Sequence, residues 1–492
     1  MKLLRNISKF GRDEAGALLV FWAVSLVMIF GLVAMSFDFG RLASTQSELQ
    51  SYADTVALAA AGELDGNSDA ITRATAAAAN LISDTQAFGS GGQALGGGGD
   101  YTIDFFDTLP PSDLSGMAAG QTNDPRDAIY ARVVVTPKTV GFTFANVFYT
   151  LSGQPRGNDQ VGAVAVAGYT QYACDVTPLM FCLPDPNYKA DANIGDMILL
   201  RSGGQGAAWG PGDFGFLDPS KIAVDDKGPC AGLKGSKLDQ CLIGAEGAIT
   251  QCFAQRGVDT EPGQKVGIED AVFNVRFDIY RATMNGKKND PLYPPAPNVI
   301  KGIVGKKKGG GGAQCIGGNE QVSPDTVGLP RDTCFANGTC SRYGNGNWAA
   351  GRTNYVAVNY GGTDPHPGAT TRYEYYLAEI AAAGGAGSGQ SILSGLAETG
   401  RPQCSNNQSS DPERRVVIAA AIDCNANPVQ GRTTNIPVKE FFRVFMTEPV
   451  GKDGASPPNL DLWVEVVGSA GGPGSGTGGT SGIFHDVVQL YR

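Results

Sequence analysis

The feature that most constrains this chain is a stretch of 23 residues without a charge, Ala15–Phe37, near its amino end. As a helix rising 1.5 Å per residue it is roughly 35 Å long, enough to cross the hydrocarbon core of a bilayer. The first twelve residues hold four basic side chains and no acidic one. We therefore expect one transmembrane helix whose amino end stays in the cytoplasm. A cleaved secretory signal is the alternative, but the apolar run is longer than a usual signal core and no convincing cleavage site follows.

The helical pattern continues past the apolar stretch. Beyond residue 38, apolar residues recur every seven positions at Leu42, Leu49 and Val56. This spacing predicts an amphipathic helix that runs to about Ala61. One long helix thus joins a membrane half to a half whose apolar face needs a partner outside the membrane. A long coiled coil is the alternative, although three alanine-rich heptads form only a marginal seam.

The ten cysteines indicate an oxidising compartment. None lies before position 174, the spacings are long, and no CxxC pair occurs, which excludes zinc-ribbon and thioredoxin-like sites. Up to five disulfides are expected in the periplasm or outside the cell, and Cys174 and Cys182 could close a short loop. Spacing alone does not give the other pairings. The disulfide candidates are Cys174, Cys182, Cys230, Cys241, Cys252, Cys315, Cys334, Cys340, Cys404 and Cys424.

Charge and histidine content disfavour two large classes of function. The formal net charge is −10, and the part after the apolar stretch holds 34 basic and 46 acidic residues. This balance argues against nucleic acid as a partner. The two histidines, His366 and His485, are too few for a zinc site built on several imidazoles. The 69 glycines and 28 prolines show no collagen period and predict a fold rich in loops.

Residues 10–66 resemble the TadE/TadG-like segment of tight-adherence (Flp) pilus assembly proteins. The elements that carry the resemblance are Gly16-Ala17, the apolar helix, the motif Asp38-Phe39-Gly40-Arg41, a polar turn at Gln46–Gln50, and Ala53-Asp54 before an alanine-rich run. The chain length and the large exported part look like TadG rather than the short pseudopilins TadE and TadF. The resemblance implies a pilus-associated protein anchored in the bacterial inner membrane.

Two departures limit what the resemblance implies. Pseudopilins of this system are processed after a glycine and usually carry Glu five residues later, whereas the fifth residue after Gly16 is Phe21. Prepilin-type processing between Gly16 and Ala17 therefore stays a candidate only. Many TadG proteins hold a von Willebrand A domain with an Asp-x-Ser-x-Ser metal motif, but Asp218-Pro219-Ser220 continues with Lys221. We expect no metal site of that kind.

Residues 38–173 are expected to form a pilin-like unit in which the long helix lies across a small sheet. A second, alanine-rich helix is predicted at 67–83, followed by a glycine-rich loop at 89–99. Alternating or β-branched residues predict strands at 101–109, 127–137 and 161–170.

Residues 174–492 are expected to form a larger exported domain of mixed helices and strands, which makes the fold class α+β. Trp209, Phe214 and Phe216 lie among turn formers, and their rings should plug into the core. The tyrosines of a predicted helix at 372–383 should seat it against a sheet. The predicted strands are 272–280, 355–360, 414–424, 440–446 and 461–468.

No local motif supplies catalytic chemistry. The segment Gly387–Ser391 is neither a nucleophile elbow nor a phosphate loop. His366 lies in a turn between prolines, and the acidic neighbour of His485 would face the opposite side of a strand. The lysines at 306–308 should be solvated, and Asp225-Asp226 lacks the spacing of known calcium loops. We expect no catalytic residue, no metal and no cofactor.

The sequence thus predicts a non-enzymatic pilus-assembly protein with a cytoplasmic stub at 1–14 and a membrane helix at 15–37. Small residues would let this helix pack against pseudopilin helices in the membrane, with lipid as the other partner. Those small residues are Gly16, Ala23, Gly31 and Ala34. The alternative is a membrane-anchored extracytoplasmic adhesin that pilus assembly does not require and whose surface ligand is unknown.

Overall fold

The structure is a computed structural model that describes residues 15–80, 83–85, 94–96, 99–109, 120–146, 150, 153, 160–174, 176–203, 208–218, 228–247, 252–254, 257–261, 269–297, 327–386, 388, 405–452, 459–471 and 484–491. The chain forms two compact units. Unit 1 is Met1–Tyr169 with Val488–Arg492, and unit 2 is Thr170–Val487. The chain leaves unit 1 within β5 (Gln160–Cys174) and returns to it within β14 (Phe484–Leu490).

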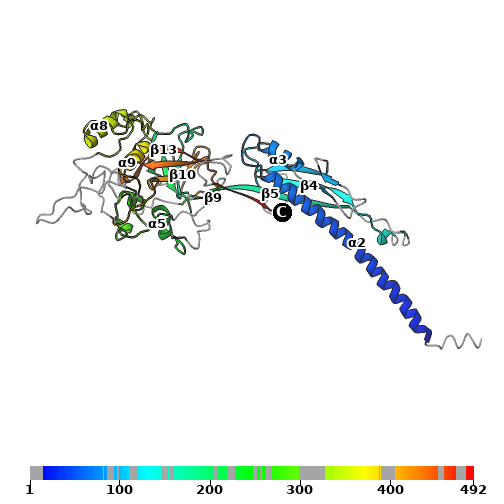
Figure 1. Cartoon of the computed structure of the whole chain (residues 1–492). Helices are drawn as coiled ribbons and strands as arrows, with labels where there is room; N and C mark the ends of the chain where they lie inside the picture. The colour runs from blue at the N-terminus through cyan, green and yellow to red at the C-terminus, as the bar shows by residue number, and fades with distance from the viewer. Residues whose placement is uncertain are drawn as a thin grey trace, which may run out of the picture. The chain divides into compact units, whose positions relative to one another are not determined.

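Unit 1 is organised by α2, a helix of 47 residues from Ala15 to Ala61. The predicted continuation of the helix to Ala61 is confirmed. The segment Gln46–Gln50, expected to be a turn, is helical instead. The carboxyl half of α2 lies along the sheet, whereas its amino half runs on beyond the sheet (Figure 1).

The sheet that includes the strands of unit 1 has the order β14-β5-β4-β3. β9 (Cys252–Ala254) pairs with residues 172–174 of β5, which belong to unit 2. Antiparallel pairing sets Val133 of β4 opposite both Ile103 of β3 and Ala165 of β5. All three strands predicted for this region are therefore present. The remaining elements of the unit are α3 (Ala70–Asn80), β1 (Ser83–Thr85), β2 (Ala94–Gly96), β3 (Tyr101–Phe106) and β4 (Tyr130–Thr139). The short strand β2 lies within the stretch that was expected to be a glycine loop.

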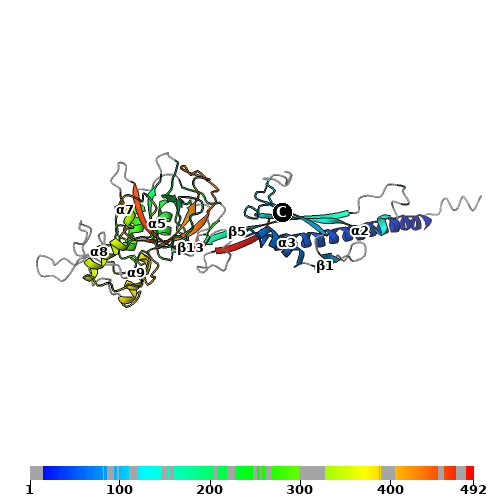
Figure 2. The ribbon, with the colours of Figure 1, turned by 90° about the horizontal axis from the view of Figure 1, so that it is seen from above.

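The core of unit 1 lies between α2 and one face of this sheet (Figure 2). Every second residue of β4 and β5 faces the helix because side chains alternate along a strand. On the helix, buried residues fall at three- and four-residue spacing and present one apolar stripe to the sheet. The stripe consists of Leu49, Tyr52, Ala53, Val56, Ala57, Ala60 and Ala61. Burial of this stripe holds α2 on the sheet.

Unit 2 is built on a closed ring of six strands. The hydrogen-bonded order is β11-β10-β6-β8-β7-β13, and β13 pairs back onto β11. The ring mixes parallel pairs, such as β10 with β6, and antiparallel pairs, such as β10 with β11. Its strands are β6 (Leu179–Cys182), β7 (Met197–Ser202), β8 (Asp213–Phe216), β10 (Val416–Ile422), β11 (Glu440–Met446) and β13 (Leu460–Gly471), and β12 (Gly451–Lys452) extends β13.

Alternate residues of all six strands meet in one apolar cluster, which fills the inside of the ring. Phe181, Phe214 and Phe442 belong to this cluster and are almost fully buried. The predicted core position of the aromatic segment is confirmed, since Trp209 is 7 % exposed and its ring lies against Gly215, where a Cβ atom would collide with it. The short helices of the unit are α5 (Ser236–Gly244), α6 (Glu269–Phe273), α7 (Thr333–Ala336), α8 (Ala349–Tyr360) and α9 (Arg372–Ala382), with 3-10 turns at Asn274–Phe277 and Ala282–Met284.

Two predictions for unit 2 are wrong. Residues 272–280 were expected to be a strand, but 272–277 form the end of α6 and a 3-10 turn and 278–280 are irregular. Residues 355–360, also expected to be a strand, form the last turns of α8. The strands predicted at 414–424, 440–446 and 461–468 and the helix at 372–383 are present within a few residues.

Candidate functional site

The helix α2 changes character at Asp38. Before this residue the apolar side chains are exposed; Leu19 and Val27 each have 74 % of their surface free. Among the described residues, one helix is long and apolar enough to span a membrane, Leu19–Ala61, and the side chains of its most apolar window are not buried. Beyond Asp38 the apolar stripe is buried, with Leu49 fully enclosed. The boundary between these halves is where polar side chains tie α2 to the rest of unit 1.

Asp38 holds a loop that comes from more than 100 residues further along the chain. Its Oδ1 accepts the backbone N–H of Thr143 at 2.9 Å, and its Oδ2 accepts those of Phe144 and Ala145 at 2.9 and 2.7 Å. Asp38 is 3 % exposed. One turn later, Arg41 Nη1 donates to Thr143 Oγ1 at 3.1 Å. A carboxylate that accepts three amide donors fixes the loop to the helix by charge-assisted bonds. We call residues 141–146, of which the last three are helical, the clamp loop.

Two glutamines continue the attachment along β5. Gln46 Nε2 donates to the carbonyl of Gly162 and Gln50 Nε2 to that of Val164, both at 3.0 Å. The next carbonyl of this row, that of Val166, accepts the N–H of Tyr491 just after β14. Four residues of helix rise about 6 Å and two residues of strand about 6.7 Å. Two glutamines four residues apart on α2 therefore have nearly the same spacing as two carbonyls two residues apart on β5. The glutamines thus extend the row of hydrogen bonds where β14 ends.

An apolar cavity lies between α2 and the clamp loop, with a volume of about 530 Å³. The Phe37 and Phe144 rings meet edge to face beside it, with centroids 5.9 Å apart. The residues that line the cavity are Met28, Gly31, Leu32, Ala34, Met35, Asp38, Phe39, Phe142, Phe144 and Ala145. Among the lining residues that the structure describes, Asp38 alone is charged, and its carboxylate oxygens accept the loop amides.

A family model described as Flp pilus-assembly TadE/G-like (Tad) matches residues 16–63. This segment is similar to the TadE/G-like family. The resemblance seen in the sequence is thereby confirmed, and the segment contains Asp38, Arg41, Gln46 and Gln50. No curated protein and no solved structure matches the chain.

The small residues predicted for helix packing lie at different places in the TadE/G-like segment. Gly31 and Ala34 line the cavity, whereas Ala23 is exposed. Gly16 and Ala17 belong to the first turn of α2, and their surroundings lie outside the described part of the structure. The sequence did not point to the clamp, although an aspartate at the end of an apolar span, followed by arginine and two glutamines four residues apart, is a visible signal.

The described cysteines of unit 2 form four disulfides. The short loop between Cys174 and Cys182 does not form, because each of these residues pairs elsewhere. The observed pairs are Cys174–Cys252, Cys182–Cys424, Cys230–Cys241 and Cys334–Cys340. The candidates Cys315 and Cys404 lie outside the described residues.

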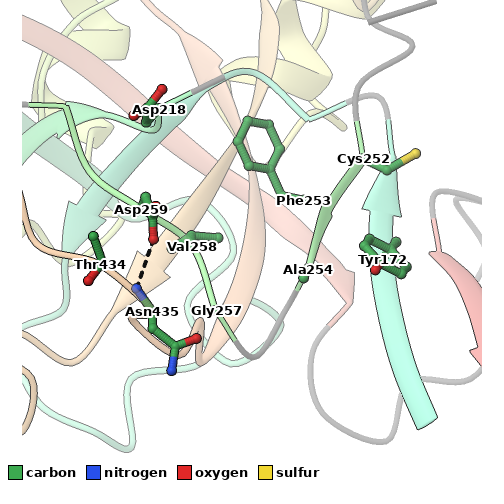
Figure 3. A pocket seen from close by; sticks show the side chains of 10 residues that line it. All are labelled: Tyr172, Asp218, Cys252, Phe253, Ala254, Gly257, Val258, Asp259, Thr434 and Asn435. Carbon is green, nitrogen blue, oxygen red and sulfur yellow. Dashed lines mark hydrogen bonds between the residues drawn. The ribbon is translucent and has the colours of Figure 1, made fainter. Parts of the chain in front are cut away.

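A second cavity, of about 610 Å³, lies within unit 2 (Figure 3). Its wall combines apolar side chains such as Phe253 with polar groups near Asp218, Asp259 and Asn435. The backbone N–H of Asn435 donates to Asp259 Oδ1 at 2.9 Å, and Arg432 Nη2 lies 2.5 Å from Asp218 Oδ2. In the part of the chain that the structure describes, no group of three or more His, Cys, Asp or Glu could hold a metal.

The remaining sequence candidates of unit 2 have structural surroundings. The imidazole of His366 lies edge-on to Tyr375 at 5.2 Å, and burial lowers the pKa of His366. Tyr376 and Tyr373 pack on Phe445 of β11 at 5.1 and 5.3 Å, so the tyrosines seat α9 on the sheet as expected. The segments 221–227, 306–308 and 389–391, with Gly387 and the side chain of His485, lie outside the described residues.

Proposed function

We propose that this protein is a structural, non-enzymatic component of Flp (tight-adherence, type IVc) pilus assembly, anchored in the bacterial inner membrane by one helix. It would act as a minor-pilin-like subunit or as a pilus-tip or anchoring protein in surface adhesion. The observation that carries the proposal is the two-part character of α2 within the TadE/G-like segment, apolar and exposed before Asp38 and packed on a sheet after it.

The proposed mechanism is lateral helix packing. Ala23 lies on the exposed half of α2 and would let the backbone of a neighbouring helix approach closely, whereas Gly31 and Ala34 face the cavity beside the clamp loop. In a membrane such packing relies on close contact rather than on burial of apolar surface, because lipid is as apolar as the helix. The partners would be the corresponding helices of pseudopilins or other pilus-assembly proteins.

The proposed orientation follows from the basic amino-terminal stub, which would keep the amino end in the cytoplasm and both units in the periplasm or outside the cell. The four disulfides agree with this side of the membrane, since such bonds persist in oxidising compartments. The contacts of Asp38, Gln46 and Gln50 would then fix the anchor helix to the exported sheet and prevent it from rotating about its axis.

The test separates anchoring from helix packing. In one variant, residues 1–37 are replaced by a cleavable export signal; in a matched control, residues 15–37 are replaced by an unrelated apolar helix of the same length. We expect both variants to lose pili and to stop co-purifying with pseudopilins. Unchanged pili in the first variant would overturn the proposal. Normal pili in the control alone would reduce the role of the helix to anchoring.

The adhesin alternative predicts a different pattern. If the gene is deleted and pili still form while surface attachment is lost, the protein is a binding module that assembly does not need. The cavity beside Asp218 and Asn435 would then be the first place to substitute (Figure 3).

A further inference from the structure

The clamp loop lies at the height of the apolar anchor rather than beyond its end. The cavity between them is lined on the helix side from Met28 to Phe39. At 1.5 Å per residue, Met28 is roughly 14 Å before the last residue of the uncharged stretch, Phe37. Side chains of the clamp loop therefore lie beside the last turns of the apolar half of α2, which is the segment that spans the membrane in the proposed function.

The surface formed by these elements is rich in exposed phenylalanine. Phe37, Phe39 and Phe144 have 54, 60 and 46 % of their surface free, and Phe142 is partly buried beside the cavity. This surface continues directly into the exposed apolar half of α2, where Leu32 is 59 % exposed. Moving rings of this size from water into hydrocarbon lowers their free energy.

Three backbone N–H groups of the clamp loop are hydrogen-bonded within the protein, as an apolar medium requires. Unpaired N–H groups are excluded from the bilayer core because no water is present to bond them. Here the three consecutive N–H groups of Thr143, Phe144 and Ala145 all donate to the carboxylate of Asp38. The Thr143 hydroxyl accepts a hydrogen bond from Arg41. These three N–H groups and the hydroxyl are thus bonded by the helix itself.

We propose that the clamp loop is a second membrane contact of this protein. Phe142 and Phe144 insert among the acyl chains of the leaflet from which α2 emerges, and acyl chains of that leaflet fill the cavity between the loop and the helix. The inference rests on the proposed anchor and adds a partner surface to it. Lipid is favoured as the occupant because the cavity is continuous with the exposed apolar surface of α2 and because Asp38, the charged residue of its described lining, is already bonded to the loop.

The test places an environment-sensitive fluorophore on the full chain in phosphatidylcholine vesicles and measures quenching by phosphatidylcholine brominated in its acyl chains. The labelled variants are Phe144→Cys, Phe30→Cys within the anchor, and Thr102→Cys on the exposed face of β3, with the unsubstituted chain as background. We expect probes at positions 144 and 30 to lose most of their fluorescence and the probe at position 102 to lose almost none.

The outcomes separate this inference from the proposed function. Quenching at position 30 without quenching at 144 overturns the second contact and leaves the anchor intact. No quenching at either position overturns both. If two copies of the unlabelled Phe144→Cys variant cross-link through position 144 and the labelled form is not quenched, the inference is also overturned, because the cavity would then hold a second copy. A second variant, Asp38→Ala, should free the three loop amides and reduce quenching at 144 while leaving that at 30 unchanged; equal quenching in both backgrounds contradicts the role given to Asp38.

Discussion

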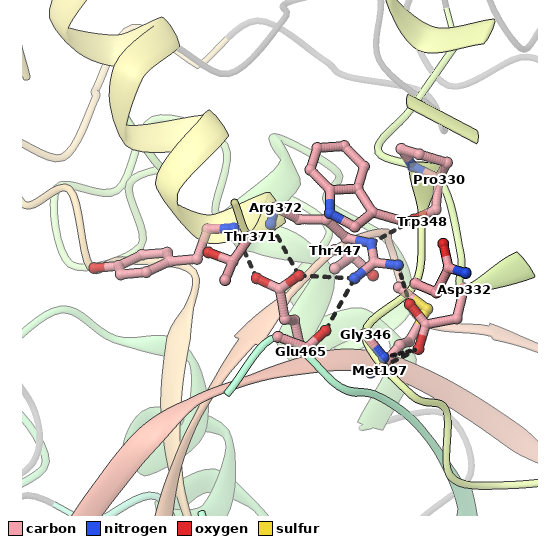
Figure 4. Close-up of polar contacts among 12 residues, drawn as sticks. Met197, Pro330, Asp332, Gly346, Trp348, Thr371, Arg372, Thr447 and Glu465 are labelled. Atoms are coloured by element: carbon pink, nitrogen blue, oxygen red, sulfur yellow. Dashed lines mark hydrogen bonds and ion pairs between the residues drawn. The ribbon is translucent and has the colours of Figure 1, made fainter. Parts of the chain in front are cut away.

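Arg372 and Glu465 form an ion pair from which water is excluded: Arg372 Nη1 lies 2.8 Å from Glu465 Oε2, and neither side chain is exposed. Glu465 also accepts the backbone N–H groups of Arg372 and Tyr373 at the start of α9, at 2.9 and 2.7 Å (Figure 4). Burial raises the pKa of Glu465, and the guanidinium and these N–H groups act against that rise. On its other side Arg372 binds Asp332 and the carbonyl of Pro330. One buried cation thus joins α9, β13 and the segment before α7.

Replacing Arg372 by methionine should destabilise unit 2 by about 3–5 kcal/mol, because two carboxylates are left buried without their cation. Urea unfolding of the full chain in detergent, followed by tryptophan fluorescence, measures the change. Lys287→Gln is the matched control, since Lys287 pairs with Asp290 at 2.9 Å while about half exposed; its cost should stay below about 1 kcal/mol. An equal loss of unfolding free energy in the two variants would show that the buried ion pair contributes no more to stability than the exposed one.

The disulfide between Cys182 and Cys424 should contribute more stability than that between Cys334 and Cys340. The first closes a separation of 242 residues and the second one of 6. In the chain-entropy model the corresponding stabilisations are about 5 and about 2 kcal/mol. Paired replacement by alanine, with midpoints measured in urea, gives the comparison. Digestion without reductant provides the check on pairing: a peptide that links Cys174 to Cys182 would contradict the structure.

The elements that the sequence predicted well are those whose pattern is local. The α2 helix follows from an uncharged stretch and a seven-residue repeat, and β10, β11 and β13 follow from runs of β-branched and aromatic residues. The return of β13 onto β11, which closes the ring, joins strands with no local signal for pairing. The Asp38 clamp has a local signal on its helix side only, and the amides that it binds lie more than 100 residues further along the chain.

The strand prediction for 272–280 was wrong because both its polar and its apolar residues are buried. Its polar residues alternate with apolar ones, which is typical of a strand with one wet face. In the structure the polar residues are buried too, and each is hydrogen-bonded: Asn274 to Val450, Arg276 to the carbonyl of Arg414, and Asp278 to the N–H of Ser405. With both faces buried, the alternation carries no information about the backbone.

The strand prediction for 355–360 was wrong for a different reason. Its tyrosine and valine residues favour a strand, but packing of Tyr355 against Tyr375 and its hydrogen bond to Glu379 hold it as a helix. The signal that could have corrected the prediction is Gly361, whose φ of 65° ends the helix in the left-handed conformation that glycine favours. Tertiary contacts decided between two local preferences.

His366 should titrate below its ordinary pKa of 6.5, because burial outweighs the carboxylate of Asp364. The folded chain then binds a proton less readily than the unfolded chain, so this residue costs stability as the pH falls below about 6.5. NMR titration measures the pKa, and His485→Gln identifies the signal. Asp364→Asn should lower the pKa further by removing the favourable charge. A value at or above 6.5 in the unsubstituted chain would contradict the partly buried position of the ring.

The two glutamines of α2 should matter as a pair. Each donates to a β5 carbonyl, and a net hydrogen bond contributes about 0.5–1.5 kcal/mol, so Gln46→Ala with Gln50→Ala should destabilise unit 1 by about 1–3 kcal/mol. Hydrogen exchange of the amides of β4 and β5 in the full chain measures this loss. Ser47→Ala, an exposed substitution on the same helix, is the control and should leave exchange unchanged. If the amides of the double variant exchange as fast as those of the control, water bonds the two β5 carbonyls as well as the glutamines do. The glutamines then contribute nothing to the stability of unit 1.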